Sequence, residues 1–467
     1  MNAGSPPPRP IRVLQFGDGN FLRGFADWVI DILNEKTDFN GDVLVIRPLR
    51  KDRMSEPDAQ QGLYHVLLNG LQNGKEVSTT RLITCLAGTI DPYQEFEKFL
   101  QAAENPDLQF VLSNTTEAGI AFDPDDKDPL AQSESFPAKL TSLLYHRFKF
   151  FQGAPDKGLI HLPCELIENN GDTLRSVVLS YCDLWKLPPE FAKWISQDNV
   201  FCNSLVDRIV PGFPKDNIEE IQKRIGYGDN HVVSAEPFHL WVIEAPESVQ
   251  QKFPAHKAGL SVKYVDDLTP YRSQKVGILN GAHTCLVPVA YLHGLRTVKE
   301  SVDDPYTGRF IRETIFEEIV PTLDLPKAEL KKFAEDTLER FQNPFIRHEL
   351  KSIALNSISK FKVRVLPTIL RFIDREQKLP LHLLYSFAAL IRFYKGDWKG
   401  EALPLADAPE VLTFFKKAWD TNNAESVVQQ VLGNKTLWDT DLTMVPGLAD
   451  YLVKSLGTLE TTGIFEG

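Results

Sequence analysis

The amino-acid sequence predicts two domains of different fold class. We expect an α/β domain with a mostly parallel sheet over residues 1–265 and a mainly α-helical domain over residues 266–467. The chain of 467 residues is too long to form one compact core. Short apolar segments alternate with amphipathic segments up to about residue 260, which indicates a parallel sheet covered by helices. From Thr269 onward the periodic segments are helical.

The first domain opens with a strand, a glycine turn and a helix. Residues 11–16 are apolar, Gly17-Asp18-Gly19 follows, and residues 25–33 have the periodicity of an amphipathic helix. This order is typical of a Rossmann-like domain, in which a helix N-terminus receives the pyrophosphate of a dinucleotide. A plain turn would also explain the glycines, because the third glycine comes two positions late, at Gly24. The cofactor contacts predicted here are Phe16, Gly17, Gly19, Asn20, Phe21 and Arg23.

Two further strands are predicted at residues 43–46 and 110–112. The second of these runs into Ser113-Asn114-Thr115, and Thr115 is a predicted cofactor contact. An acidic residue after the second strand usually binds the ribose 2′-hydroxyl of NAD, whereas an arginine suits the 2′-phosphate of NADP. Here the strand ends at Arg47 and Asp52 lies a little further on, so these residues leave both cofactors open.

The second domain is predicted from amphipathic segments that prolines separate. The expected helices cover residues 313–320, 327–340, 344–355, 383–393 and 410–419.

Composition and charge exclude several classes of protein. The formal net charge of −12 disfavours nucleic-acid binding, and no segment approaches the roughly 20 apolar residues of a membrane helix. The five cysteines and ten histidines have no metal-ligand or disulfide spacing, and the N-terminus lacks the apolar core of a signal peptide. We therefore expect a cytoplasmic protein without a metal, either a monomer or a small homo-oligomer. Any anionic ligand needs a locally positive site.

The segment Lys275-Val-Gly-Ile-Leu-Asn280-Gly-Ala-His283 carries the strongest functional pattern. Thr269-Pro270 is a helix-start signal. On an α-helix, which advances about 100° per residue, Lys275 and Asn280 lie about 140° apart with His283 between them. One face of the helix would offer an amine, an amide and an imidazole to a small polar ligand. Spacing alone is also consistent with a solvated lysine, a capping asparagine and a core histidine.

The same segment resembles the Lys-x4-Asn-x2-His pattern of the long-chain mannitol/polyol dehydrogenases. Residues 201–211 are similar to the Val-Asp-Arg-Ile signature of this family, and residues 236–244 are similar to a second family block. Residues 163–171, 340–344 and 354–356 with Lys360 look most like the sugar-acid branch of the family, which interconverts tagaturonate and altronate. These blocks follow one another from about residue 11 to about residue 400.

The resemblance implies a metal-independent oxidoreductase that uses NAD and a sugar-acid substrate. Lys275 would be the acid/base, because an ammonium group can stabilise the developing oxyanion and supply its proton. Its early position in the helix and partial burial favour a lowered pKa. Asn280 would donate to the same oxygen, and His283 would hold a neighbouring hydroxyl.

Two further catalytic candidates come from the first domain. Many family members have an asparagine directly after a Cys-acidic pair, which is Cys164-Glu165 in this chain, but here that position is Leu166. We therefore expect Asn170 to be the second oxyanion donor. An Asn-Gly pair is also a common turn. Glu117 matches a family glutamate thought to exchange protons with solvent and is also a predicted cofactor contact; capping of the following helix is the alternative.

The substrate carboxylate would be bound by the helical domain. Lys360 and Arg364 are four residues apart and share a helix face, with Arg347 and His348 shortly upstream. A solvated charged face would give the same spacing.

Four other functions compete with this interpretation. Within the family these are fructuronate reductase and a mannitol-type polyol dehydrogenase. A nicotinamide-binding sensor would have no use for a proton donor, and a metal-dependent epimerase would need ligand clusters that the sequence lacks.

Overall fold

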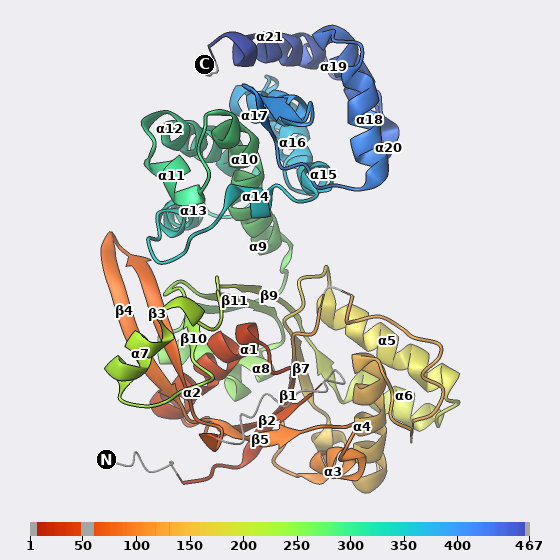
Figure 1. Cartoon of the computed structure of the whole chain (residues 1–467). Coiled ribbons are helices and arrows are strands. Elements are labelled where there is room, and N and C mark those ends of the chain that lie inside the picture. Colours follow the sequence, from red (N-terminus) through yellow and green to blue (C-terminus); the bar gives the residue numbers. More distant parts are fainter. Residues whose placement is uncertain (1–6, 48–59, 117, 130, 463–467) are drawn as a thin grey trace. The chain divides into compact units, whose positions relative to one another are not determined.

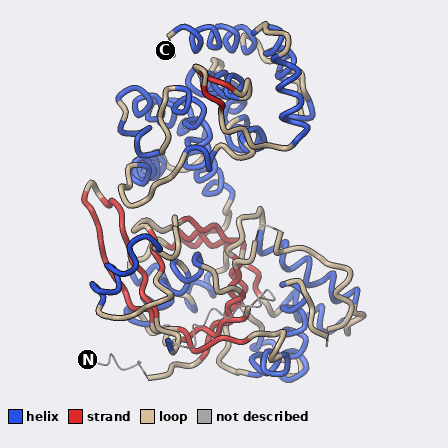
Figure 2. Tube along the Cα trace, viewed as in Figure 1, coloured by secondary structure: helices blue, strands red, loops and turns tan. Residues whose placement is uncertain are grey.

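The computed structural model describes residues 7–47, 60–116, 118–129 and 131–462. The described chain forms two compact units (Figures 1 and 2). The first unit contains the residues up to Asn69 and from Glu76 to Leu268, and the second contains Gly70–Lys75 and the residues from Thr269 onward. The sequence analysis placed the division between residues 265 and 266. An α/β unit followed by a mainly helical unit confirms the predicted fold class.

The first unit is built on a six-stranded parallel sheet in the order β5-β2-β1-β6-β7-β8. Its strands are β1 (Ile11–Phe16), β2 (Asp42–Ile46), β5 (Leu86–Ile90), β6 (Phe110–Ser113), β7 (Ile160–Pro163) and β8 (Val200–Phe201). The chain runs outward from β1 in one direction and then in the other. Ligands of such sheets bind beyond the carboxyl ends of the strands where the direction switches, here between β1 and β6.

Helices cover both faces of this sheet. Val13 and Leu14 are adjacent in β1 and belong to two different buried clusters, because successive strand residues point to opposite faces. The helices of the first unit are α1 (Asn20–Gly24), α2 (Ala26–Lys36), α3 (Phe96–Gln101), α4 (Phe136–Phe150), α5 (Asn170–Leu184), α6 (Pro189–Gln197), α7 (Ile218–Ile225) and α8 (Glu247–Lys252). Its smaller sheets contain β3 (Tyr64–Gln72), β4 (Lys75–Ile83) and β10 (Val233–Ala235), and β9 (Asn203–Asp207), β11 (Leu240–Glu244) and β12 (Val262–Val265).

The predicted helix over residues 25–33 corresponds to α2. A short helix that was not predicted, α1, starts at Asn20, and the backbone breaks at Phe25 between the two helices. A Cβ atom on Gly24 would lie 2.9 Å from Cγ1 of Val210 and 3.0 Å from Cγ1 of Val233. The late third glycine therefore serves the close packing of a helix on a strand.

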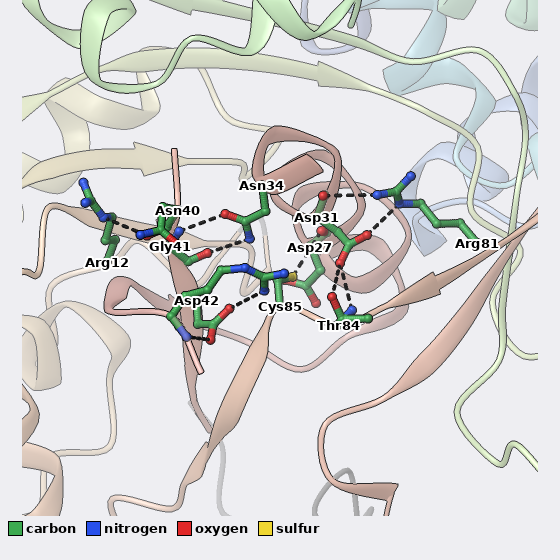
Figure 3. Close-up of polar contacts among 11 residues, drawn as sticks. Arg12, Asp27, Asp31, Asn34, Asn40, Gly41, Asp42, Arg81, Thr84 and Cys85 are labelled. Carbon is green, nitrogen blue, oxygen red and sulfur yellow. Dashed lines mark hydrogen bonds and ion pairs between the residues drawn. The ribbon is translucent and has the colours of Figure 1, made fainter. Parts of the chain in front are cut away.

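Side-chain hydrogen bonds tie α2 to the neighbouring strands (Figure 3). Asp31 accepts from the amide and hydroxyl of Thr84, at 2.8 and 2.9 Å, and pairs with Nε of Arg81 at 2.7 Å. Asn34 exchanges two 2.8 Å hydrogen bonds with the backbone of Gly41, just before β2. These contacts fix the helix that follows the glycine turn.

The second unit is mainly helical and also contains the tip of the β3–β4 hairpin and the short hairpin β13 (Asp397–Trp398) and β14 (Glu401–Ala402). Its helices are α9 (Thr269–Gln274), η6 (Lys275–Gly281), α10 (Ala282–Leu292), α11 (Val298–Asp303), α12 (Pro305–Glu313), η7 (Thr314–Ile319), α13 (Lys327–Phe341), α14 (Leu350–Ile353), α15 (Ser357–Arg364), α16 (Leu366–Glu376), α17 (Leu381–Phe393), α18 (Pro409–Trp419), α19 (Ala424–Leu432), α20 (Lys435–Trp438) and α21 (Leu448–Thr461). In the part of the chain that the structure describes, no helix has the length and apolar character needed to span a membrane.

The predicted helix over residues 344–355 is wrong except for the single turn α14. The side chain of Asn343 accepts from the amide of Phe345 at 2.9 Å, which starts a turn. Glu349 then forms an antiparallel bridge with Thr297, and the amide of Val298 donates to the carbonyl of His348 at 2.9 Å. The segment is extended because its backbone pairs with a distant part of the chain. The prediction over 313–320 also differs, since that segment is mostly the π-helix η7.

Candidate active site

Lys275, Asn280 and His283 lie on one continuous helix that changes its winding. Residues Lys275–Gly281 form the π-helix η6, between α9 and α10. The angles expected for an α-helix therefore do not apply here. A π-helix bonds residue i to residue i+5, so it brings Lys275 and Asn280 towards the same side. His283 follows in the first turn of α10.

Two glycines let neighbouring helices approach η6 closely. A Cβ atom on Gly281 would lie 3.3 Å from the carbonyl oxygen of Arg364, and one on Gly277 would lie 3.3 Å from Cγ2 of Ile319. The end of α15, which carries Arg364, therefore packs directly on the helix of the predicted catalytic residues.

His283 is buried and its ring is held by two aromatic neighbours. It stacks on Phe341 with 4.1 Å between ring centroids and meets His348 edge-on at 5.1 Å. Its Nε2 atom has no hydrogen-bond partner among the described residues. Burial, and then the charges of His348, Arg340 and Arg364, lower the pKa of His283 well below its usual value. His283 is therefore neutral at neutral pH and available to hydrogen-bond a ligand.

Three basic side chains act on His283, and a fourth, Lys360, lies beside Arg364. We call these residues the basic cluster: His283, Arg340, His348, Lys360 and Arg364. Nζ of Lys360 donates to the carbonyl of Ile353 at 2.8 Å. Burial and the neighbouring Arg364 lower the pKa of Lys360. The structure thus brings together three of the four residues predicted for the substrate carboxylate. It adds Arg340, which lies in a block that the sequence analysis used only as a family signature.

Lys275 and Asn280, on the same helix as His283, differ in exposure. Lys275 is buried, whereas Asn280 is half-buried and its carbonyl accepts from Oγ1 of Thr284 at 2.8 Å.

The fourth predicted carboxylate ligand, Arg347, has a side chain that is 80% exposed and pairs with Glu349 at 2.6 Å. The structure does not favour Arg347 as a substrate ligand.

The first unit contains a groove at the point where its strand order switches. A cavity of about 480 Å³ is lined by the glycine turn, the segment after β6 and the start of α4. Among the predicted contacts, Gly17, Gly19 and Thr115 line it. The other lining residues are Asp18, Asn114, Thr116, Ala118, Gly119, Ala121, Phe122, Asp123, Glu134, Ser135 and Phe136. Its volume is that of a typical small-molecule site.

The remaining predicted cofactor contacts support the turn instead of lining this groove. Phe16 is fully buried against Phe136, and Phe21 stacks on Phe25 with 5.0 Å between ring centroids. Arg23 donates to Oδ1 of Asn20 at 2.8 Å. Glu117 lies outside the described residues, as does Asp52.

Arg47 follows β2, as predicted, and lies beside the glycine turn. Its Nε atom is 3.9 Å from Oδ2 of Asp18. Asp18 also lines the groove. An arginine is thus present at this end of the sheet, and it already faces a carboxylate.

Glu165 is the buried residue that shapes the segment after β6. Its carboxylate accepts from Oγ of Ser113 at 3.0 Å and from the amide and hydroxyl of Thr115 at 3.0 and 3.1 Å. Burial raises its pKa. The sequence analysis missed this role, although Glu165 is part of the quoted Cys164-Glu165 block.

Asn170 is enclosed by backbone. It is fully buried, and its Nδ2 atom lies 2.9–3.0 Å from the carbonyls of Pro163, Glu165 and Ser204. Its Oδ1 atom accepts from the amides of Gly171 and Ser204. Because both amide hydrogens are engaged, the structure gives Asn170 a role in joining β7 to β9 and does not favour a contact with substrate.

A buried polar network lies beneath the glycine turn. Nε2 of Gln15 donates to the carbonyl of Gly17 at 3.2 Å, and the hydroxyl of Tyr64 is 3.1 Å from the carbonyl of Arg23 and 2.9 Å from Oδ2 of Asp27. Asp27 is fully buried, and burial raises its pKa to about 7.

No group of three or more histidine, cysteine, aspartate or glutamate side chains in the described ranges is arranged to hold a metal ion.

Profiles of one family match most of the chain. The mannitol dehydrogenase Rossmann domain matches residues 11–257, and the mannitol dehydrogenase C-terminal domain matches residues 267–460.

Curated relatives are similar over nearly the whole chain. The altronate oxidoreductase of Bacteroides thetaiotaomicron is 46% identical over 460 residues, which cover 98% of this chain and 96% of the relative. That of Bacillus subtilis is also 46% identical, with 97% of this chain and 94% of the relative covered. That of Escherichia coli is 45% identical, with 98% and 96% covered.

Solved structures show the same fold. A substrate-free D-sorbitol dehydrogenase is 22% identical with a TM-score of 0.83, covering 97% of this chain and 94% of its own. The Pseudomonas fluorescens mannitol 2-dehydrogenase, in a ternary complex with NAD and D-mannitol, is 21% identical with a TM-score of 0.71, covering 97% and 93%.

Proposed function

Since this chain belongs to the mannitol dehydrogenase family, we propose that it is an altronate oxidoreductase that interconverts D-tagaturonate and D-altronate with NAD. Identities of 45–46% over nearly the full length of relatives with that activity support the reaction. The helical unit supports a sugar-acid substrate, because it concentrates basic side chains in a chain of net charge −12.

The groove of the first unit suits a dinucleotide. It lies beyond the ends of β1 and β6, and a Cβ atom on Gly19 would meet no other atom within 4 Å, so the turn is open to a ligand. We propose that Gly17, Gly19, Asn114 and Thr115 hold the cofactor. When bound, its nicotinamide supplies the hydride that the ketone accepts.

Lys275 is proposed as the acid that protonates the ketone oxygen during reduction and as the base in the reverse direction. Asn280, which the π-helix brings towards the same side, donates an amide hydrogen to that oxygen. The second amide donor that Asn170 was expected to supply has no replacement in this proposal.

The observation that carries the proposal is the buried, unpartnered Nε2 of His283 beside cationic neighbours. Buried polar atoms are nearly always hydrogen-bonded, so one that has no partner among the described protein groups points to a ligand. We propose that it binds a substrate hydroxyl, while Lys360 and Arg364 bind the carboxylate.

The cofactor preference is the second half of the proposal. The solved relative holds NAD, and Arg47 already faces Asp18, so NADH should be preferred over NADPH. A strong NADPH preference that Arg47→Ala abolishes would reverse this assignment.

The reaction is tested by following NADH oxidation with tagaturonate and with its epimer fructuronate, and by identifying the product. Altronate as the product and a higher kcat/KM for tagaturonate are expected. A preference for fructuronate would assign the chain to the other sugar-acid activity.

A further inference from the structure

Part of the groove wall in the first unit is built from two chain segments that meet. Residues 118–123 and 134–136 lie on either side of a loop that leads into α4, and together we call them the outer wall. Asp123 and Ser135, one from each segment, both line the groove. The distance across the groove therefore depends on what holds these two segments in place.

The hydroxyl of Tyr181 joins the two segments from behind. Tyr181 lies on α5 and is fully buried. Its hydroxyl oxygen accepts from the amide of Asp123 at 2.9 Å and lies 2.9 Å from Oγ of Ser135. It is also 3.2 Å from the carbonyl of Asp123.

The ring of Tyr181 supports the same wall. It packs on Phe122 with 4.9 Å between ring centroids, and Phe122 lines the groove and is 41% exposed. Tyr181 thus contacts three wall residues without lining the groove itself.

A second support, formed by Trp185 and Asp126, holds the same loop through backbone groups. Nε1 of Trp185 donates to the carbonyl of Asp126 at 2.7 Å. The carboxylate of Asp126 accepts from the amides of Glu134 and Ser135 at 2.8 and 3.0 Å. Neither Asp126 nor Trp185 lines the groove, but Glu134 and Ser135 do, so this support holds the same wall through its backbone.

We propose that Tyr181 is a positioning residue that sets dinucleotide affinity by fixing the outer wall. It touches no cofactor atom and acts through Asp123, Ser135 and Phe122. The inference rests on the proposed function, because it takes the groove as the dinucleotide site. Loss of the hydroxyl leaves the amide of Asp123 without its partner, and a single such bond is worth about a threefold to tenfold change in an equilibrium constant.

The test is Tyr181→Phe, which keeps the ring and removes only the hydroxyl. NADH binding, followed by fluorescence titration, should weaken by about threefold to tenfold. The kcat at saturating NADH should stay within about twofold, because no reacting group is touched. Hydrogen exchange at the amide of Asp123 should speed up in the variant, since its acceptor is gone.

A control separates positioning from general stability. Tyr145→Phe removes a hydroxyl from α4, where the ring packs edge-on against Phe191. It should bind NADH nearly as the wild type does, whatever it does to Tm. Trp185→Phe does not serve as a control, because Trp185 packs on Tyr181 with 5.0 Å between ring centroids.

An unchanged NADH Kd in Tyr181→Phe, or an equal loss in Tyr145→Phe, would overturn the inference and leave the proposed function standing. If the variant folds poorly, the same Kd is measured for Ser135→Ala, which removes the bond from the wall side, and an unchanged value there overturns the inference too. A wild type that does not bind NADH at all would overturn the proposed function, and the inference with it.

Discussion

Two buried supports of the groove in the first unit, Glu165 and Asn170, differ from His283 in the basic cluster of the second unit in how their polar atoms are satisfied. Around the groove, Glu165 accepts three hydrogen bonds and both amide hydrogens of Asn170 are engaged by backbone. In the basic cluster, Nε2 of His283 has no partner among the described residues. Fully bonded buried groups fix a shape, whereas an unpartnered one points to a ligand.

This difference assigns separate tasks to the two units. The groove depends on backbone geometry, small residues and buried supports, so its variants should change cofactor affinity and stability. The basic cluster depends on charge, so its variants, and those of Lys275 and Asn280 on the π-helix, should change turnover and substrate choice.

The largest effect is expected for Lys275→Ala. Loss of a general acid/base lowers turnover by about 10²–10⁴-fold, while NADH affinity should persist, because the groove residues lie in the first unit. Steady-state kinetics with a fluorescence titration of NADH measure both effects. Lys351→Ala, on the exposed side of α14, is the matched control. Near-normal turnover in Lys275→Ala would remove this lysine from the mechanism.

A smaller effect is expected for Arg364→Ala. Loss of a charge-assisted contact to the substrate carboxylate should lower kcat/KM for tagaturonate by about 10–100-fold. Activity on fructose, which lacks a carboxylate, should change much less. Arg347→Ala is the control, because Arg347 is mostly exposed and paired with Glu349. Equal losses of kcat/KM for tagaturonate in Arg364→Ala and Arg347→Ala would contradict the assignment of Arg364 to the substrate carboxylate.

The smallest effect on turnover, and a marked one on stability, is expected for Asp27→Asn. Burial raises the pKa of Asp27 from 3.8 to about 7, so the folded state binds this proton more tightly than the unfolded state. Its contribution to stability is fully present below about pH 4 and is lost as the pH rises to about 7, by about 1.4 kcal/mol per pH unit. The asparagine of the variant does not ionise, so its free energy of unfolding does not fall in this way as the pH rises.

The Tm of Asp27→Asn should therefore rise relative to the wild type between pH 5 and pH 8. A Tm difference that is the same at both pH values would mean that Asp27 titrates in the folded protein as it does in the unfolded chain.

Sequence patterns predicted the fold class because strand and helix periodicities are local properties. They also placed Lys275, Asn280 and His283 on one helix. The π-helical winding could not be predicted, because the segment has the same apolar pattern as an α-helix, and the close approach of other helices at Gly277 and Gly281 is a tertiary contact. Likewise, residues 344–349 have a helical pattern but pair with Thr297 and Val298, and no local pattern encodes such a distant partner.

Tertiary packing also decides which of the predicted site residues can reach a ligand. Arg347 and Arg364 look alike in the sequence, and only the packing of α15 on η6 separates a residue near His283 from an exposed one. Asn170 carries the right chemical group for an oxyanion donor, but its hydrogens are taken by carbonyls from three segments of the chain. The roles of Lys275, Asn280 and His283 stay predictions.

The most direct test of the central claim, that the helical unit recognises a sugar acid, is the ratio of wild-type kcat/KM values for tagaturonate and fructose. Fructose lacks the carboxylate that the basic cluster would bind, and the loss of such matched polar contacts is worth about 10⁴-fold or more. We expect a ratio of that order. Comparable values for the two substrates would contradict recognition of the carboxylate by the basic cluster and indicate a polyol dehydrogenase.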